Sequence, residues 1–276
     1  MMRLGIFAKT FAGTDPMTVL RAARDAGFAA VQYNMACSGL AAMPDQIAPE
    51  ITLAIRQASA ETGVAIAAVS GTYNMIHPDA SVRDTGMRRL GLLIENAAAM
   101  GTGLVTLCTG TCDPDDQWRG HPDNDTPAAW ALLCAEMAKA VELAEARGVK
   151  LGIEPELANV VSDAARARLL IDTLQSPALA IVLDPANLFD FTTLKQQYKI
   201  LNHAVELLAD RIVMAHAKDR DAQGGFVTAG QGVVDFKHFL AALRMNGFDG
   251  DLVTHGLTAP EAAGVARFLA DTLDSL

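Results

Sequence analysis

Four residues that can bind a metal ion lie at the ends of four successive apolar segments in the second half of the chain. Glu154 ends LGIE, Asp184 ends AIVLD, His216 ends RIVMAH and His255 ends LVTH. They recur at intervals of roughly 30 to 40 residues, about the length of one strand and the helix that leads to the next parallel strand. If the four segments are neighbouring parallel strands, their last side chains gather at one end of one sheet. We predict a shared metal site there.

The donor atoms of this set indicate which ion it would bind. One Glu, one Asp and two His supply oxygen and nitrogen ligands, which hold a divalent ion at about 2.0–2.3 Å. We therefore expect one divalent metal ion. Two imidazoles favour Mn²⁺, Co²⁺ or Zn²⁺ over Mg²⁺, and the donor set does not distinguish among these three.

Strand-like and helix-like segments alternate along all 276 residues. The strand-like segments are continuously apolar, which is typical of parallel strands buried on both faces. They cover about residues 3–8, 28–33, 64–70, 103–108, 149–154, 179–184, 211–216 and 251–255. The predicted helices cover about residues 15–26, 46–62, 80–100, 126–147, 161–174, 195–209, 235–246 and 259–275.

Eight such units predict an α/β protein, a single-domain (β/α)8 TIM barrel over residues 1–276. A doubly wound open sheet is the alternative, and it is disfavoured because no G-x-G-x-x-G follows the first strand. Five of the predicted helices are followed by a glycine where a left-handed cap is needed, at Gly27, Gly63, Gly101, Gly148 and Gly247.

Two connections are longer than a simple turn. Residues 109–125 follow the fourth strand and residues 217–234 follow the seventh. Both leave the carboxyl ends of strands, where barrel enzymes place their chemistry. We expect both loops to cover the site.

The charge balance limits the classes of partner. Lys and Arg number 22 against 32 Asp and Glu, which gives a net charge of −10 and a pI of about 5.0. Nucleic acids and anionic lipids are bound by clusters of Lys and Arg, and the sequence has no such cluster. No apolar run approaches the length of a membrane span. We expect a small substrate, with no nucleic acid and no membrane.

Other features point to the compartment and to assembly. The four cysteines form no scaffold pattern, so we expect reduced thiols in a cytoplasmic protein. The segment MMRLGIFAK runs directly into a strand pattern, and we expect no signal peptide. A mean hydropathy of +0.21 suggests a buried subunit face, hence a homo-oligomer such as a dimer or tetramer.

Five segments give the chain a resemblance to the xylose-isomerase-like barrels, the sugar phosphate isomerases and epimerases. The resemblance extends nearly end to end and is carried by GIEPE (152–156), VLDPAN (182–187), AHAKD (215–219), AGQGVVDF (229–236) and GDLVTHGL (250–257). In that family, Glu, Asp, His and Glu on strands five to eight bind one divalent metal. The resemblance places the first three ligands at Glu154, Asp184 and His216.

The chain departs from the family on its eighth strand. His255 lies where the ketose epimerases have a second glutamate, which together with the first carries protons on the two faces of the sugar. A histidine can still bind metal, but the two-glutamate relay does not transfer to this chain. The family's G-x-G-x-x-D segment is present as Gly230, Gly232 and Asp235, and we expect Asp235 to cap the following helix.

Several polar residues close to the same strand ends are further candidates. Glu156 is a candidate base or substrate ligand, and Lys218 a candidate for holding a carboxylate, phosphate or enediolate. The candidate substrate-binding residues are Asn74, His77, Trp118, His121, Asn187 and Asp219. Among these, His77 is expected to point towards the site, Trp118 to stack on a sugar ring and Asp219 to pair with Lys218. Structural alternatives are a salt-bridged loop position for Glu156, a helix cap for Asn187 and a loop anchor for Trp118.

Three functions compete for this set of residues. The first is an isomerase or epimerase of a sugar, keto-sugar or related polyol, in which the metal stabilises an enediolate and a carboxylate moves the proton. The second is a metal-dependent dehydratase, or a hydrolase, on the same scaffold. The third is a binding protein without catalysis. An endonuclease is disfavoured because the chain lacks a basic groove and the additional histidines of a multi-metal cluster.

Overall fold

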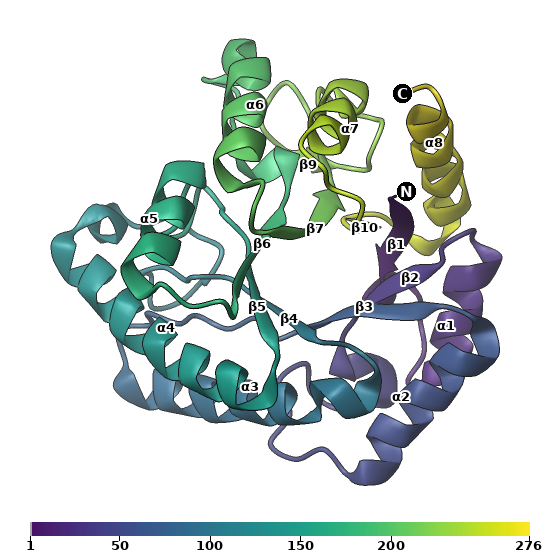
Figure 1. Cartoon of the computed structure of the whole chain (residues 1–276), viewed down its shortest axis with the longest axis horizontal. Helices are drawn as coiled ribbons and strands as arrows, with labels where there is room; N and C mark the ends of the chain where they lie inside the picture. Colours follow the sequence, from purple (N-terminus) through teal and green to yellow (C-terminus); the bar gives the residue numbers. More distant parts are fainter. Residues whose placement is uncertain (1) are drawn as a thin grey trace.

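Eight parallel strands close into a barrel in the computed structural model, which describes residues 2–276 (Figure 1). The prediction of a (β/α)8 TIM barrel is confirmed. Around the barrel each strand pairs with the next along the chain, and β10 closes the ring against β1. The strands are β1 (Arg3–Phe7), β2 (Ala30–Tyr33), β3 (Ala65–Ser70), β4 (Leu104–Leu107), β5 (Lys150–Ile153), β6 (Leu179–Leu183), β7 (Ile212–Ala217) and β10 (Asp251–Thr254).

Eight α-helices surround this barrel (Figure 1). They are α1 (Pro16–Asp25), α2 (Pro49–Thr62), α3 (Ala80–Met100), α4 (Pro127–Arg147), α5 (Ala164–Leu174), α6 (Gln197–Leu208), α7 (Phe236–Met245) and α8 (Ala262–Asp274). All five predicted cap glycines have positive φ, from 63° to 98°. These caps end each helix sharply and let a short turn lead into the next strand.

The structure differs from the prediction at helix starts and in one loop. Proline occupies the first position of α2, and Asp163 caps α5 through the amide of Arg166, so both helices begin three residues later than predicted. The long loop after β7 contains a short antiparallel hairpin, β8 (Asp219–Arg220) with β9 (Phe226–Val227). Its strands are two residues long, too short to give a periodic signal in the sequence.

The barrel interior is filled in layers by alternate residues of the strands. Its apolar layer consists of Ala68, Leu104, Val182, Met214 and Val253, which form a cluster of their own. A methyl group added at Gly152 would lie 2.8 Å from the Val182 side chain, so β5 also faces this layer. Since side chains on one face of a strand recur every second residue, the next inward position on each strand lies one layer nearer the carboxyl ends.

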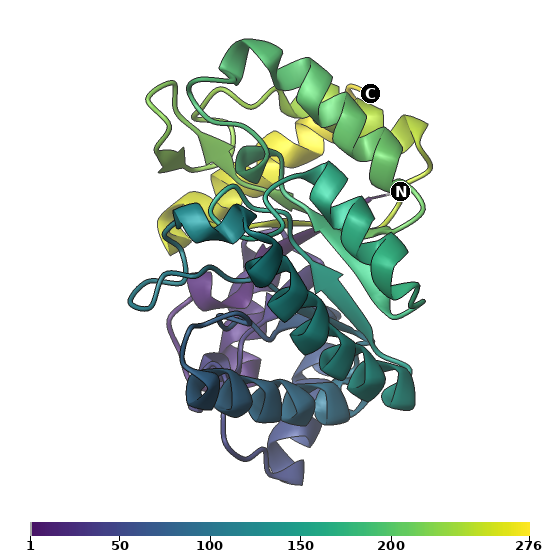
Figure 2. The same ribbon diagram turned by 90° about the vertical axis from the view of Figure 1, so that its left-hand side faces the viewer.

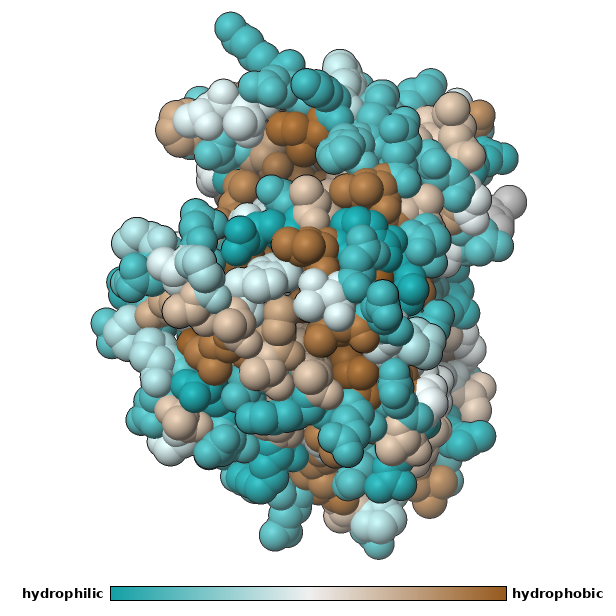
Figure 3. Space-filling view, turned by 60° about the vertical axis from the view of Figure 1, so that its left-hand side comes forward, coloured by the Kyte–Doolittle hydropathy of each residue, from teal (hydrophilic) through white to brown (hydrophobic). Residues whose placement is uncertain are grey.

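The loop after β4 and the β8–β9 hairpin project on the same side of the molecule, while the start of β1 and the end of α8 lie on the other side (Figure 2). On the face seen in Figure 3, polar side chains predominate at the edges and apolar ones gather in the middle. No helix among residues 2–276 is long and apolar enough to cross a membrane. The four cysteines are free thiols.

Candidate metal centre

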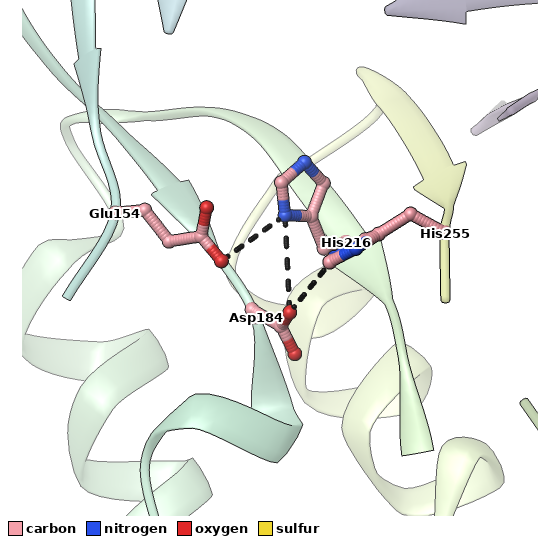
Figure 4. Close-up of side chains that lie close together, drawn as sticks. All are labelled: Glu154, Asp184, His216 and His255. Atoms are coloured by element: carbon pink, nitrogen blue, oxygen red, sulfur yellow. Dashed lines mark hydrogen bonds and ion pairs between the residues drawn. The ribbon is translucent and has the colours of Figure 1, made fainter. Parts of the chain in front are cut away.

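The four predicted ligands meet at the carboxyl end of the barrel. Glu154, Asp184 and His255 each follow directly after a strand, and His216 is the fifth residue of β7. Each lies two residues beyond an inward-facing position: Gly152 for Glu154, Val182 for Asp184, Met214 for His216 and Val253 for His255. The two-residue alternation of strands therefore turns all four side chains into the barrel, where they point towards one another (Figure 4).

One donor atom from each of these residues lies within 4.8 Å of the other three. Donor atoms that share an ion with bonds of about 2.1 Å are at most about 4.2 Å apart, so small side-chain shifts bring all four into range. Asp184 Oδ2 is 3.1 Å from His255 Nε2 and 3.8 Å from His216 Nδ1, and Glu154 Oε1 is 3.3 Å from the same Nδ1 (Figure 4). The donors therefore fit one divalent ion.

The charged groups of the cluster act strongly on one another. Burial opposes the ionisation of Asp184, but Lys218 and the two imidazoles outweigh it and hold its pKa below the ordinary value. Burial also opposes the charged form of His216, yet Glu154 and Asp184 raise its pKa. For His255, burial and the charge of His216 together lower the pKa. His255 is therefore held neutral, the form in which histidine binds metals.

Two hydrogen bonds in series, from Lys218 through Asn187, orient Glu154. Lys218 Nζ donates to Asn187 Oδ1 at 2.6 Å, and Asn187 Nδ2 donates to Glu154 Oε1 at 2.7 Å. Because an ammonium group can only donate, the amide oxygen of Asn187 must face Lys218 and its nitrogen must face Glu154. Lys218 also lies 3.3 Å from Asp184 Oδ2, so one buried cation supports both carboxylates.

A cavity of about 400 Å³ opens over the cluster. Glu154, His216 and His255 line it, together with residues from the opposite half of the barrel and from the loop after β4, among them Lys9 and Trp118. Trp118 is 53 % exposed, and its predicted stacking on a sugar ring stays a prediction. A larger cavity, about 660 Å³, lies at the other end of the barrel around Phe248 and Leu273, away from the four ligands.

Glu156 is not among the residues that line this cavity. Burial, reinforced by the charges of Glu154 and Asp184, raises the pKa of Glu156 to about 7. Lys218 and Arg220 oppose that shift. The side chain therefore shares the electrostatic surroundings of the cluster, while Glu154 is the carboxylate that faces the open space.

Three of the residues expected to contact a substrate connect loops through their side chains, and their contact with a substrate stays a prediction. Asn74 bonds to the backbone of Thr111 through both ends of its amide. His77 Nε2 lies 3.0 Å from the carbonyl oxygen of Pro114, and Nδ1 accepts from the amide of Asp79, so both ring nitrogens contact loop backbone. His121 accepts from the amide of Asp123 and caps a short 3₁₀ helix.

The expected pairing of Asp219 with Lys218 is wrong. The fully buried Asp219 carboxylate accepts from the amides of Gly230, Gly232 and Val234 and from its own neighbour. A side chain at Gly232 would collide with this carboxylate. Asp219 thus explains Gly232, whereas Gly230 has a φ of 86° and lies close to the ring of Phe268. Asp235 caps α7 as predicted.

Replacing Asp219 with Ala is expected to destabilise the protein by about 3 kcal/mol, because four backbone amides, two of them in buried bonds, lose this fully buried acceptor. Urea unfolding measures the change. Asp221→Ala is the matched control, since Asp221 also accepts two amides, from Gln223 and Gly225, but in a partly exposed turn. We expect that control to cost less than about 1 kcal/mol. Equal losses would contradict the role given to Asp219.

One residue of the site was not predicted from the sequence. Gln32, on β2, accepts a hydrogen bond of 2.8 Å from His216 across the barrel and lines the cavity. A signal was available, because Gln32 is a polar residue inside the otherwise apolar strand segment FAAVQY.

Fold and site together define a (β/α)8 barrel with, at its carboxyl end, a cluster of four residues that could hold a metal ion. The sequence matches the model of the xylose isomerase-like TIM barrel family over residues 20–270, and the chain belongs to that family.

Solved structures share this fold at low sequence identity. An L-ribulose 3-epimerase is 19 % identical, with a TM-score of 0.76, and the match covers 100 % of this chain and 95 % of that one. A D-tagatose 3-epimerase-like protein is 16 % identical, with a TM-score of 0.77 and coverage of 99 % and 98 %. A 3-keto-D-glucoside 4-epimerase from E. coli is 16 % identical, with a TM-score of 0.76 and coverage of 98 % and 100 %. Comparison with curated proteins finds no match.

Proposed function

We propose that the protein is a divalent-metal-dependent isomerase or epimerase of a small polyhydroxylated carbonyl compound, a sugar, keto-sugar or related polyol. The observation that carries the proposal is the position of Glu154, which belongs to the ligand cluster and also lines the cavity. A carboxylate placed between an ion and a substrate can move a proton on the carbon next to a carbonyl. The sugar epimerases among the solved structures support this choice of substrate.

Glu154, Asp184, His216 and His255 would hold the ion, through two carboxylate oxygens and two imidazole nitrogens. Nitrogen donors favour Mn²⁺, Co²⁺ or Zn²⁺ over Mg²⁺. When bound, a divalent ion supplies a Lewis acid that polarises a carbonyl and makes the neighbouring C–H bond more acidic.

Side chains of the protein would move the proton, orient the base and contact the substrate. Glu154 Oε1 is tied to Asn187 and His216, whereas Oε2 receives no hydrogen bond from the described residues and is free to accept the substrate proton. Lys218, acting through Asn187, fixes the direction in which that oxygen faces. Trp118 closes one side of the cavity, where an aromatic face can pack on a sugar ring.

A dehydratase is the second candidate, and His255 is the observation that favours it. With a histidine at this position, the cluster lacks the second glutamate that would act on the opposite face of a sugar. One base is sufficient to remove a proton and expel a neighbouring hydroxyl group, whereas epimerisation must also return a proton to the other face.

Product analysis distinguishes the two candidates. The ion-loaded protein is incubated with a panel of ketoses and keto-sugars in D₂O, and products are examined by mass spectrometry and NMR. An isomerase or epimerase conserves the elemental composition and incorporates one solvent deuterium on carbon. A dehydratase yields a product lighter by one water. If neither change occurs with any substrate while the ion is bound, both candidates are excluded for this panel, and a hydrolase or a binding protein without catalysis remains.

His255→Glu tests whether the imidazole is chiefly a ligand. We expect the variant to keep its ion and to retain more than about one tenth of the activity, because the carboxylate supplies an equivalent donor atom. Bound metal is measured by elemental analysis beside the turnover rate. A variant that holds the ion but has lost its activity would show that the imidazole of His255 takes part in the chemistry.

The proposal extends to the compartment, the partners and the assembly of the protein. We propose a cytoplasmic enzyme with a small substrate and no nucleic acid partner, in keeping with the net charge of −10. A homo-oligomer, dimer or tetramer, would cover exposed apolar side chains such as Leu169, Phe191 and Tyr198.

A further inference from the structure

We propose that Gln32 is a positioning residue that fixes His216 as a ligand through Nδ1. The inference rests on the proposed ion site and adds a part of the barrel that the four ligands do not include. Gln32 belongs to β2, on the far side of the barrel from β7, and it is buried. It touches the cluster through His216 alone among the four ligands.

The two ring nitrogens of His216 face different partners. Nδ1 faces the carboxylates, at 3.3 Å from Glu154 Oε1 and 3.8 Å from Asp184 Oδ2. Nε2 faces away from them and lies 2.8 Å from Gln32 Oε1. An imidazole that binds a metal is neutral, so it carries its hydrogen on one nitrogen and binds the ion through the other. A hydrogen on Nε2 therefore leaves Nδ1 free to bind the ion.

The orientation of the Gln32 amide decides where that hydrogen lies. Gln32 Nε2 is 3.0 Å from both Ser70 Oγ and Thr106 Oγ1, which come from β3 and β4. Each amide hydrogen thus has its own acceptor, and Oε1 is left to accept from His216. The flipped amide would direct one hydrogen at His216 and leave the other buried without an acceptor, which is unfavourable.

The consequence is a connection across the barrel. Ser70 and Thr106 hold Gln32, Gln32 holds the imidazole of His216, and the imidazole presents Nδ1 to the ion. Partners that hold the second nitrogen of a metal-binding histidine typically change metal affinity by about 10 to 100-fold when they are removed. The first half of the barrel would therefore contribute to ion affinity without supplying a ligand.

The test measures Co²⁺ affinity by absorption titration for wild type, Gln32→Leu and Gln32→Glu. We expect Gln32→Leu to bind about 10 to 100-fold more weakly. Gln32→Glu should bind close to wild type, because its carboxylate can still accept from Nε2. Gln117→Leu is the matched control: it removes the same amide from a residue that lines the same cavity and makes no hydrogen bond to either imidazole.

A second measurement does not depend on how well the variants fold. ¹⁵N NMR of the Zn²⁺-loaded wild type should show hydrogen on Nε2 of His216 and metal on Nδ1. Hydrogen on Nδ1, or wild-type affinity in Gln32→Leu, would overturn the role of Gln32 and leave the ion site standing. Wild-type protein that binds neither ion would remove the proposed site itself.

Discussion

Asp184→Asn is expected to lower ion affinity by at least about 1,000-fold, since loss of even an outer partner of a ligand costs about 10 to 100-fold. The change keeps the shape of the side chain, and its Oδ1 can still accept the hydrogen bond that the amide of Ala186 donates. It removes the negative charge at Oδ2, which faces His216, His255 and Lys218. Turnover should fall with ion occupancy, and both are measured on the same preparation.

The same substitution should also lower the free energy of unfolding of the ion-free protein, because Lys218 is left buried beside a neutral group. Removing one partner of a buried ion pair typically costs about 3–5 kcal/mol. Combining Asp184→Asn with Lys218→Met removes both charges, and we expect most of that stability to return while the ion stays unbound. Full ion occupancy in Asp184→Asn, at wild-type affinity, would show that the site is wrongly placed.

The ligand set was predictable because it depends on strand geometry alone. Side chains at corresponding ends of neighbouring parallel strands must meet, whatever the loops do, and cap glycines mark the start of five of the eight strands, among them those that lead to Glu154 and His255. Glu154, Asp184, His216 and His255 were found by this rule, and the structure brings all four together. The barrel itself followed from the same alternation of elements.

Residues in loops were not predictable in the same way. Asn74 and His77 follow β3 closely enough to reach the site, yet their side chains bond to the backbone of the loop after β4. Asp219 is adjacent to Lys218 but faces the amides of Gly230 and Gly232. The orientation of these side chains depends on hydrogen bonds between loop segments that are distant in the sequence. No periodic pattern in the sequence predicts such bonds.

Gln32 was not predicted for a different reason. A search for metal-binding side chains at strand ends passes over a glutamine inside a strand. Its importance lies in its hydrogen bond to His216, which is 184 residues away in the chain. A polar residue in an apolar strand is nevertheless a physical signal, because a buried amide needs partners on both its ends.

Glu154→Gln is expected to lower kcat by about 10² to 10⁴-fold, the usual contribution of a general base. The glutamine keeps an oxygen that can accept from Asn187 and bind the ion, but it cannot take up a proton. Assays at saturating ion, with bound metal measured in parallel, separate the lost base from a weakened site. The exchange of substrate hydrogen for solvent deuterium should fall by the same factor as kcat.

Glu156→Gln is the matched comparison, since it is the same chemical change two residues further along the chain. Glu156 does not line the cavity, so we expect its loss to change kcat by less than about tenfold, below the usual contribution of a general base. Its position two residues after Glu154 makes it a candidate base as well, and its raised pKa, about 7, suits that role. If Glu156→Gln abolishes deuterium exchange while Glu154→Gln retains it, Glu156 carries the proton and Glu154 serves as a ligand only.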